Sequence, residues 1–431
     1  MLGLLVGLGL LIYTAMRGIN LFIAAPVCAL IVALTSNLSI FPGQETSASF
    51  VTSYMDGFSS FIAAWFFMFL LGSLFGKFME DTGTADSIAH WIVGKIGKKH
   101  AVLAVVISCA LLTYGGVSLF VVAFSVYPLA LSLFKDANLP RRFIPAALAF
   151  GSVTFTMTSA GSPEIQNWIP IKYLGTSPFA AWEVSLVVAV FMATFGYWWL
   201  NKMLKSAVAR GEQFAARDDD PQTDERQLPS PLTGVLALLA VLVFSFLLHD
   251  SLQQYALIIA LLAGVLVIVI ANWKFFKDIQ AAITSGTTGA LVAIGNTAAV
   301  VGFGAIAKQS EGFAYAVELM TSLPGNELIG AALAVSVIAG LTGSASGGQA
   351  IALPILAPHY TELGVPPEQL HRIVSISSGA LDSLPHNGYV VTTIRAICGE
   401  THQAAYGPMA ALTVVVPLLG LILAIALFSI F

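Results

Sequence analysis

The sequence predicts an all-α polytopic membrane protein, with about ten transmembrane helices and two re-entrant hairpins arranged in two inverted-topology repeats. Two observations carry this prediction. Of the 431 residues, 57% are hydrophobic and only 10% are charged, whereas soluble proteins carry about 25% charged residues. Apolar runs also recur along the whole chain, and about 20 apolar residues are enough for a helix to cross the hydrocarbon core.

Composition excludes several other classes of protein. The three cysteines, Cys28, Cys109 and Cys398, lie in apolar runs without the paired spacing of a disulfide framework or a metal site. The net charge is -4 and no basic stripe is present, which argues against nucleic-acid binding. The chain has no zinc-protease, serine-hydrolase or phosphate-loop motif. We therefore expect a protein that is not an enzyme and that needs no cofactor or metal.

Ten apolar runs have the length and composition of membrane spans. The first run begins without the positive segment of a signal peptide, so we expect it to be retained in the mature protein. In chain order the runs cover residues 2–16, 19–36, 58–78, 142–159, 178–201, 231–248, 255–272, 282–307, 371–396 and 407–430.

Two further apolar runs are interrupted at their centres by small residues. They cover about 101–134 and 327–360, and neither interruption carries a charge. Two straight helices would need a polar connection at that point. Non-helical backbone at membrane depth is tolerated only where it is buried in protein or lines a cavity, so we predict that each run is a hairpin that enters and leaves on the same side.

The distribution of basic residues supports this topology. With both runs as hairpins, 16 of the 19 Lys and Arg residues fall in loops on one side, and only Lys172, Lys308 and Arg372 fall on the other. Short loops rich in Lys and Arg face the cytoplasm. We therefore predict a multi-pass protein of the bacterial cell inner membrane with both termini in the periplasm. The polar loop 202–229 is then cytoplasmic, and we expect it to be a flexible linker.

The two sides of this linker have the same predicted organisation. Residues 1–201 contain a hairpin at about 101–134 and a broken helix at about 142–170, and residues 230–431 contain a hairpin at about 327–360 and a broken helix at about 371–396. An odd number of crossings in each half gives the halves opposite orientations. Shifting one half by 228 residues places Gly115 on Gly343 and Ser118 on Ser346. Inverted repeats of this kind are typical of secondary transporters.

Each broken helix is interrupted by proline and glycine, at 158–167 and at 379–388. Proline removes a backbone donor, and glycine allows the helix to open. Free backbone N–H groups at helix N-termini, together with small hydroxyls, can bind an anion without arginine. The alternative is that the glycines and serines serve only close helix packing.

Three ionisable residues fall in these interruptions, namely Glu164, Asp382 and His386. Charged groups at membrane depth are costly and usually functional, and histidine changes its charge near neutral pH. We predict that the three residues couple transport to protons, with Asp382 and His386 acting as a pair. The alternative roles are structural: Glu164 at the outer interface, Asp382 as an acceptor for unwound backbone, and His386 as a core residue.

Three stretches, 112–120, 155–170 and 378–388, resemble the gluconate permease family, and within it the branch of D-beta-hydroxybutyrate and short-chain carboxylate permeases. The resemblance implies a proton-coupled carboxylate symporter of the ion transporter superfamily, with inverted repeats, paired hairpins and a dimeric scaffold. Residues 159–163 depart from the run expected in close relatives. The substrate-site residues that the interruptions and the resemblance indicate are Gly115, Gly116, Ser118, Ser162, Gln166, Asn167, Ser344, Ser346, Gly347, Gly348 and Asn387.

The sequence thus predicts a homodimeric secondary active transporter that works by elevator-like alternating access. Its predicted partners are a small hydroxymonocarboxylate, such as 3-hydroxybutyrate, lactate or gluconate, together with protons and the lipid bilayer. Two alternatives remain open from the sequence. One is a sodium-coupled symporter of carboxylates or dicarboxylates, and the other is a passive anion channel.

Overall fold

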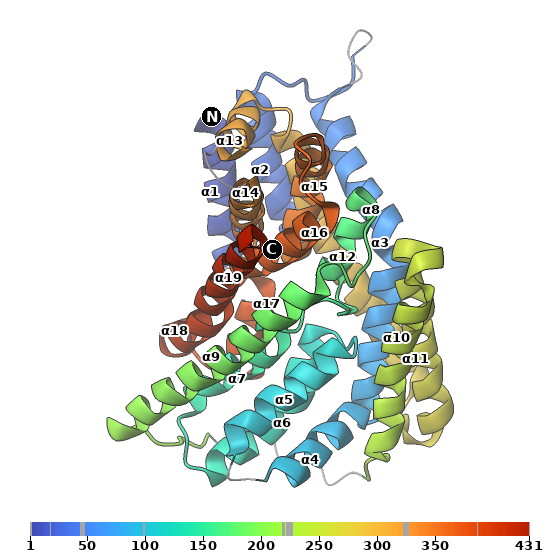
Figure 1. Cartoon of the computed structure of the whole chain (residues 1–431), viewed down its shortest axis with the longest axis vertical. Coiled ribbons are helices and arrows are strands. Elements are labelled where there is room, and N and C mark those ends of the chain that lie inside the picture. Colours follow the sequence, from blue (N-terminus) through green and yellow to red (C-terminus); the bar gives the residue numbers. More distant parts are fainter. Residues whose placement is uncertain are drawn as a thin grey trace.

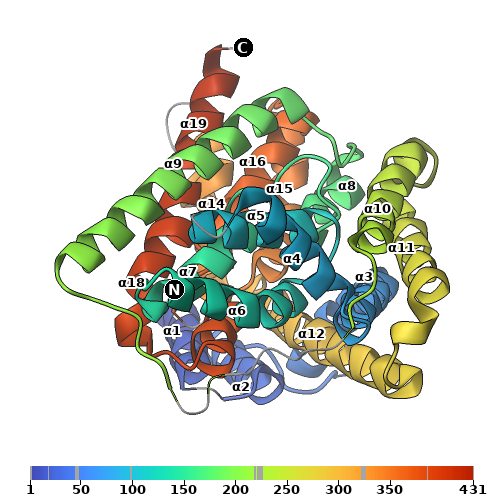
Figure 2. The same ribbon diagram turned by 90° about the horizontal axis from the view of Figure 1, so that it is seen from below.

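The described part of the chain contains helices and no strands, which confirms the predicted all-α class. The computed structural model describes residues 2–17, 19–43, 48–97, 100–217, 220, 227–321, 327–385 and 387–430. Figure 1 shows the chain from the first helix to the last, and Figure 2 shows it from below. In both views α10 and α11 form one edge of the molecule. The long helix α9 crosses the molecule diagonally in Figure 1 and lies along another edge in Figure 2.

The linker divides the helices between two halves of the chain. The first half contains α1 (Leu2–Met16), α2 (Leu21–Thr35), α3 (Phe50–Asp81), α4 (Thr84–Ile96), α5 (Ala101–Tyr114), α6 (Leu119–Asp136), α7 (Ile144–Ala149), α8 (Ile169–Leu174) and α9 (Trp182–Ala209). The second half contains α10 (Pro231–Leu252), α11 (Ala256–Asn272), α12 (Ile279–Ala307), α13 (Glu311–Thr321), α14 (Glu327–Thr342), α15 (Ala345–Glu362), α16 (Pro367–Ala380), α17 (Gly388–Val391), α18 (His402–Ala410) and α19 (Val416–Ile430). The offset of 228 carries the last residue of α14 onto the last residue of α5. This agreement supports the inverted repeat, which stays a prediction.

Six helical stretches among the described residues are long and apolar enough to cross a membrane. They are Phe50–Asp81, Leu119–Asp136, Trp182–Ala209, Pro231–Phe275, Ile279–Ala307 and His402–Ile430. The stretch Pro231–Phe275 contains both α10 and α11. Four shorter apolar helices accompany them, so the chain is a membrane-integral protein with several spans, while the count of ten stays a prediction.

A helical hairpin stands at each of the two predicted places. The arms α5 and α6 pack against each other, as do α14 and α15. The connections contain Gly116 with a φ of 94° and Gly343 with a φ of 62°. Glycine is favoured there because a Cβ atom makes positive φ costly. The interruptions that the sequence shows at small residues are therefore tight turns between antiparallel helices.

Both predicted broken helices are also present. The first consists of α7 and a π-helical turn, Phe150–Thr154, followed by irregular backbone up to the short helices Ile165–Asn167 and α8. The second consists of α16, a break that includes Pro385, then α17 and a π-helical turn, Thr392–Ile397. Polar backbone freed at such breaks must find other partners when it lies at membrane depth.

The guanidinium of Arg372 supplies many of these partners for the first broken helix. Arg372 lies in α16 and is fully buried. Its Nη1 donates to the carbonyl oxygen of Thr158 at 2.7 Å and to Oδ1 of Asn167 at 3.0 Å, and its Nη2 donates to the carbonyl oxygen of Ala180 at 2.9 Å. Further bonds reach Ala180 from Nε, at 3.1 Å, and Pro178 from Nη2, at 3.4 Å. One side chain of the second half thus holds the unwound backbone of the first.

This position corrects the expectation that Arg372 lies in an outward loop. The helix α16 begins at Pro367, earlier than the predicted start at 371, so Arg372 falls within its second turn. Two helices outside the predicted spans, α4 and α13, are further differences. Their mean apolar character is too low for a membrane span, because each mixes charged and apolar residues on a short helix.

Other polar contacts join the hairpins to the broken helices. Nε2 of Gln349 in α15 donates to the carbonyl oxygen of Gln166, at 2.9 Å. Nδ2 of Asn387 donates to the carbonyl oxygen of Gly343, at 2.9 Å. The Tyr114 hydroxyl donates to the carbonyl oxygen of Ala160, at 2.6 Å. We call α5–α8 together with α14–α17 the central unit, because these contacts connect its four parts.

The first three helices of each half form a second group, which we call the frame. It consists of α1–α3 and α10–α12. In the frame α3 packs along α12 and α11, while α2 packs on α12 and on α1. The Tyr54 hydroxyl donates to the carbonyl oxygen of Ala299, and the Ser73 hydroxyl donates to that of Gly286, at 2.9 and 2.8 Å. These bonds join α3 to α12 at two heights.

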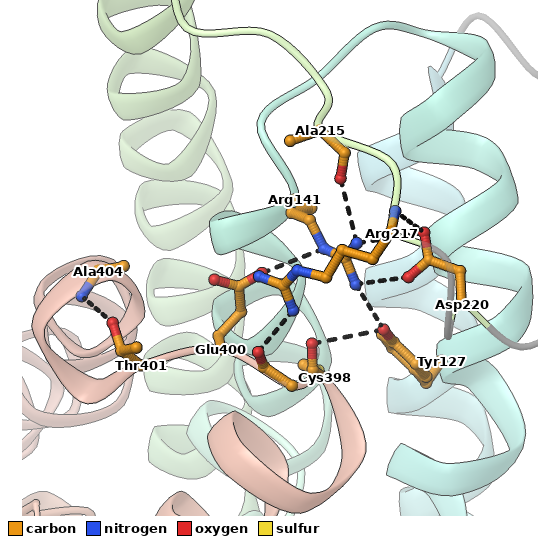
Figure 3. Close-up of polar contacts among 10 residues, drawn as sticks. Tyr127, Arg141, Ala215, Arg217, Asp220, Cys398, Glu400, Thr401 and Ala404 are labelled. Atoms are coloured by element: carbon orange, nitrogen blue, oxygen red, sulfur yellow. Dashed lines mark hydrogen bonds and ion pairs between the residues drawn. The ribbon is translucent and has the colours of Figure 1, made fainter.

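The linker between the halves is held by ion pairs at its beginning, where we expected a flexible segment (Figure 3). Arg141 pairs with Asp220 at 2.8 Å and with Glu400 at 3.1 Å, and Arg217 pairs with the same Glu400 at 2.8 Å. Arg142 pairs with Glu212 at 2.6 Å. Hydrogen bonding from Arg142 holds the pKa of Glu212 below its usual range. The described linker residues therefore connect the end of the first hairpin to the end of the second broken helix.

Replacing Arg372 should strongly destabilise the protein. In Arg372→Met several buried oxygen acceptors lose their donors, and removal of one partner from a buried charged network costs about 3–5 kcal/mol. Arg372→Lys should rescue little, since one ammonium cannot reproduce the planar fork of donors. The measurement is the thermal unfolding midpoint of the purified protein in detergent. The matched control is Arg395→Met, which replaces an exposed arginine. An unchanged midpoint for Arg372→Met would show that the guanidinium does not hold the broken helices together.

Candidate functional site

A cavity of about 760 Å³ lies between the central unit and the frame. Both hairpin tips and both helix interruptions contribute to its wall, and α3, α11 and α12 of the frame complete it. Eight of the residues singled out from the sequence line this cavity. They are Gly116, Ser118, Glu164, Gln166, Ser344, Ser346, Asp382 and Asn387. The fold thus brings residues from four separate stretches of the chain to one place.

The N-cap residues of three helices line this cavity. Ser118, Ser344 and Asn387 precede α6, α15 and α17, and each lines the cavity. The Ser344 hydroxyl accepts from the N–H of Gly347 at 3.1 Å, and Oδ1 of Asn387 accepts from the N–H of Val390 at 3.0 Å. No such side-chain cap is made by Ser118. The N-terminus of α6 therefore has the positive end of its dipole and uncapped donors beside the cavity.

Gln166 offers a second polar group that is unsatisfied within the described protein. Its side chain is 8% exposed, and its Oε1 atom is buried without a hydrogen-bond partner among the described residues. Its backbone carbonyl accepts a hydrogen bond from Nε2 of Gln349, which is not among the residues that line the cavity. A buried polar atom left unpaired is costly unless water or a ligand satisfies it. The side chain of Gln166 is therefore available to a bound molecule.

The carboxyl groups of Glu164 and Asp382 line the same cavity. Asp382 is 7% exposed and accepts a hydrogen bond from the Ser383 hydroxyl at 3.0 Å. Within the described residues, neither carboxyl group has an ion-pair partner. The third predicted coupling residue, His386, lies outside the described residues. Glu164 lies in the cavity wall and is half-buried.

The cavity is poor in positive charge. Lys77 is the single lysine or arginine among the described residues that line it, and its ammonium pairs with Glu80 at 2.8 Å. An anion in the cavity would therefore be bound by helix N-termini, hydroxyls and amides rather than by an unpaired cation. Such groups stabilise one negative charge far better than several.

Five other residues predicted for the substrate site do not line this cavity: Gly115, Ser162, Asn167, Gly347 and Gly348. The structure gives them packing or backbone contacts. A Cβ atom on Gly115 would lie 2.4 Å from the Leu238 side chain, and one on Gly348 would lie 2.6 Å from the Ala339 backbone.

The asparagine and serine of this set stabilise the first interruption. Nδ2 of Asn167 donates to the carbonyl oxygens of Ser162 and Pro178, at 3.1 and 2.8 Å. The N–H of Gly347 donates to the Ser344 hydroxyl, which caps α15. These five residues thus determine the backbone shape of the hairpin tips and helix interruptions. The residues that line the cavity are neighbours of these five in the sequence.

The frame contributes polar residues that the sequence reasoning missed. Ser73 of α3 and Ser285, Thr288, Asn296 and Thr297 of α12 line the cavity. Oδ1 of Asn296 has no partner among the described residues. The signal was present in the sequence: polar and small residues recur on α12 at three- and four-residue spacing, which indicates one helix face.

Comparison with known proteins identifies the family. Residues 10–283 match the family described as citrate transporters (CitMHS). The chain belongs to the citrate transporter family. Over 96% of its length it is also 35% identical to the uncharacterized transporter YxjC of Bacillus subtilis (strain 168), and the match covers 95% of that protein. This citrate transporter family member is therefore a transporter and not an enzyme, as the sequence predicts.

Two further similarities agree with that assignment. The chain is 27% identical to the high-affinity gluconate transporter of Escherichia coli (strain K12) over 147 residues, which are 33% of this chain and 31% of that one. Its fold resembles the crystal structure of the YdaH transporter of Alcanivorax borkumensis, with a TM-score of 0.61, 16% identity, and coverage of 99% and 98% of the two chains. The family member is thus a secondary transporter of the citrate transporter and gluconate permease type. The D-beta-hydroxybutyrate branch stays a prediction.

Proposed function

We propose that the protein is a proton-coupled symporter of a small hydroxymonocarboxylate, such as 3-hydroxybutyrate, lactate or gluconate, in the bacterial inner membrane. The observation that carries the proposal is the central cavity, in which helix N-termini, hydroxyls and an unpaired amide meet the two unpaired carboxyl groups of Glu164 and Asp382. Among the described residues that line the cavity, the one lysine is paired with Glu80. A transporter of this family requires a site for a small anion. This cavity has the chemistry of such a site.

In this proposal the carboxylate of the substrate lies near the N-terminus of α6. The uncapped N–H groups there and the Ser118 hydroxyl donate to it, and Ser346 contributes a second hydroxyl from the other hairpin. The amide groups of Gln166 and Asn296 then face the substrate's own hydroxyl. Amides can both donate and accept, so they match a hydroxyl better than an apolar group.

The charge of the cavity favours a monocarboxylate over a tricarboxylate. Each additional buried carboxylate would need its own compensating charge, and Lys77 is already paired with Glu80. Citrate, for which the family is named, is the strongest competing substrate. Gluconate, which the Escherichia coli relative carries by its name, fits the proposed chemistry as a hydroxymonocarboxylate.

A counterflow assay in proteoliposomes tests the substrate class. We expect 3-hydroxybutyrate, lactate or gluconate to exchange with saturation, and citrate and succinate to be poor competitors, because the cavity neutralises one negative charge. Each compound is added to the outside of vesicles that contain a labelled hydroxymonocarboxylate, with protein-free vesicles as the control. Saturable citrate exchange without a response to any monocarboxylate would overturn the proposal.

We propose that Glu164 and Asp382 carry the coupled protons, with His386 as a further member. Both carboxyl groups line the cavity, and neither has an ion-pair partner among the described residues. A carboxyl group in this position can bind a proton when the substrate binds and release it on the other side. Protonation also removes a negative charge that would repel the substrate carboxylate.

Neutral variants separate coupling from binding. In Asp382→Asn and Glu164→Gln, a pH gradient should no longer drive accumulation, because the replaced group cannot release a proton. Substrate exchange should remain measurable, because the amide keeps the size and hydrogen-bonding capacity of the carboxyl group. Glu183→Gln, an exposed residue of α9, is the matched control. Accumulation by both variants at the wild-type level, or accumulation driven by sodium alone, would contradict proton coupling through these residues.

We further propose that the central unit moves against the frame, as in an elevator. With the predicted topology, with both termini in the periplasm, Lys77 faces the cytoplasm and the cavity described here opens inward. The contacts of Arg372, Gln349 and Asn387 connect the central unit internally, whereas its boundary with the frame includes small residues such as Gly76 beside Val121. Rigid-body motion of one group against the other is a common route to alternating access. The frame would then carry the contact of a homodimer.

A disulfide across this boundary should stop transport. A Cβ atom on Gly76 of α3 would lie 3.4 Å from Cβ of Val121 in α6, close to the spacing that a disulfide requires. The pair Gly76→Cys and Val121→Cys is made in a background without the three native cysteines. Oxidation should abolish net uptake while ligand-induced thermal stabilisation persists, and reduction should restore uptake. Each single-cysteine variant is the control, and full transport by the oxidised pair would exclude the motion.

A further inference from the structure

A second, smaller cavity of about 120 Å³ lies on another part of the boundary between the frame and the central unit. Its walls come from α3 and α12 of the frame and from α8 and α15 of the central unit. Two lysines line it, Lys172 of α8 and Lys308 directly after α12. They lie 136 positions apart in the sequence, and only the fold places them at one cavity.

The charge of this second cavity is uncompensated. No aspartate or glutamate is among the described residues that line it, and neither lysine has an ion-pair partner within the described chain. The ammonium of Lys172 lies 5.6 Å from the centre of the Tyr173 ring. Burial lowers the pKa of Lys308. Two like charges at one cavity repel each other unless an anion lies between them.

The helices that form the walls of this cavity are closely packed against one another. A Cβ atom on Gly57 would lie 2.7 Å from Cβ of Ala305, and one on Gly304 would lie 2.4 Å from the Ile351 side chain, so α3, α12 and α15 already pack at their closest. The buried side chain of Trp65 also contributes to the wall. Lys172 is exposed and Lys308 is half-buried, so a ligand can reach both ammonium groups.

We propose that this cavity binds a phosphate group between Lys172 and Lys308. Two ammonium groups match a doubly charged oxyanion, and lysine binds phosphate well as a point charge. The Ser60 hydroxyl, which also lines the cavity, adds a polar group. The phosphate group can come from inorganic phosphate or from the headgroup of an anionic lipid, since both present the same oxygens.

Binding at this place has a consequence for transport that rests on the proposed elevator motion. The ligand would touch α12 of the frame and α8 of the central unit at once. It would therefore stabilise the arrangement described here and slow the movement of one group against the other. Phosphate at the outer face would then act as an inhibitor that does not compete with the substrate.

Protection of the lysines from chemical acylation tests the site itself. The full chain in detergent is treated with an amine-acylating reagent with and without inorganic phosphate, at constant ionic strength set with chloride, and labelling of each lysine is measured by mass spectrometry. At a phosphate concentration ten times the dissociation constant, labelling of Lys172 and Lys308 should fall about tenfold. Labelling of the exposed Lys274, on the opposite predicted side, should not change. Lys308→Gln should remove the protection of Lys172, and Lys274→Gln should leave it intact.

A lipid arm separates the two sources of phosphate. The same labelling is carried out in nanodiscs of phosphatidylglycerol and of phosphatidylcholine without free phosphate. Protection only in phosphatidylglycerol assigns the site to a lipid headgroup, and protection by free phosphate in detergent assigns it to the soluble ion. Equal labelling of Lys172 and Lys308 under all conditions would overturn the proposal. This result is independent of transport, so it does not depend on the fate of the proposed symport.

Transport measurements then test the consequence. Outside phosphate should slow substrate exchange by wild-type protein, and it should not slow exchange by the Lys172→Gln and Lys308→Gln double variant. Protected lysines together with unchanged exchange would overturn the bridging role and leave the binding site in place.

Discussion

A single buried guanidinium holds together the part of this protein that departs from regular helix. Arg372 lies in the second half of the chain, and its donors reach carbonyl oxygens of Thr158, Pro178 and Ala180 and the side chain of Asn167 in the first half. An arginine without a carboxylate partner is unusual inside a membrane protein. Here its charge is compensated by carbonyl dipoles that the broken helix exposes, so the cost of breaking the helix and the cost of burying the charge offset each other.

The same exchange of polar partners recurs throughout the central unit. Gln349 satisfies the carbonyl of Gln166, Asn387 satisfies that of Gly343, and Tyr114 satisfies that of Ala160. Each contact links two different parts, so the polar groups that make interruptions possible also make the four parts one body. In the frame, small buried residues of α12 pack against large aromatic and methionine side chains of α3. A boundary with glycine on one side and aliphatic side chains on the other is suited to sliding, because few hydrogen bonds must be broken.

The distribution of charge separates three regions of the molecule. Ion pairs of Arg141, Arg217 and Glu400 hold the linker at one end. Among the described residues, the main cavity is lined by carboxyl groups and by one lysine that is already paired, whereas the smaller cavity is lined by two lysines and no carboxyl group. An organic anion fits the main cavity only if its negative charge is small or neutralised. The charge of the substrate is therefore the property that experiments should test. The membership of the citrate transporter family shows that the protein is a transporter, and the chemistry of the cavity supports the proposal of a singly charged substrate.

The sequence by itself determined the features that depend on local chemistry. Glycine and proline affect the conformation of their own backbone, so Gly116, Gly343 and Pro385 indicated the hairpin tips and the second helix interruption. The low content of charged residues indicated that the helices span a membrane. Only the tertiary structure decided which residues face the cavity. Ser118 lines it while Gly115 packs on Leu238, and Arg372 turns inward from a position that reads as a loop. The rotation of a helix, and the partner that a polar group finds, are set by neighbours distant in the chain. For Arg372 those neighbours lie some two hundred residues away, and no local pattern records them.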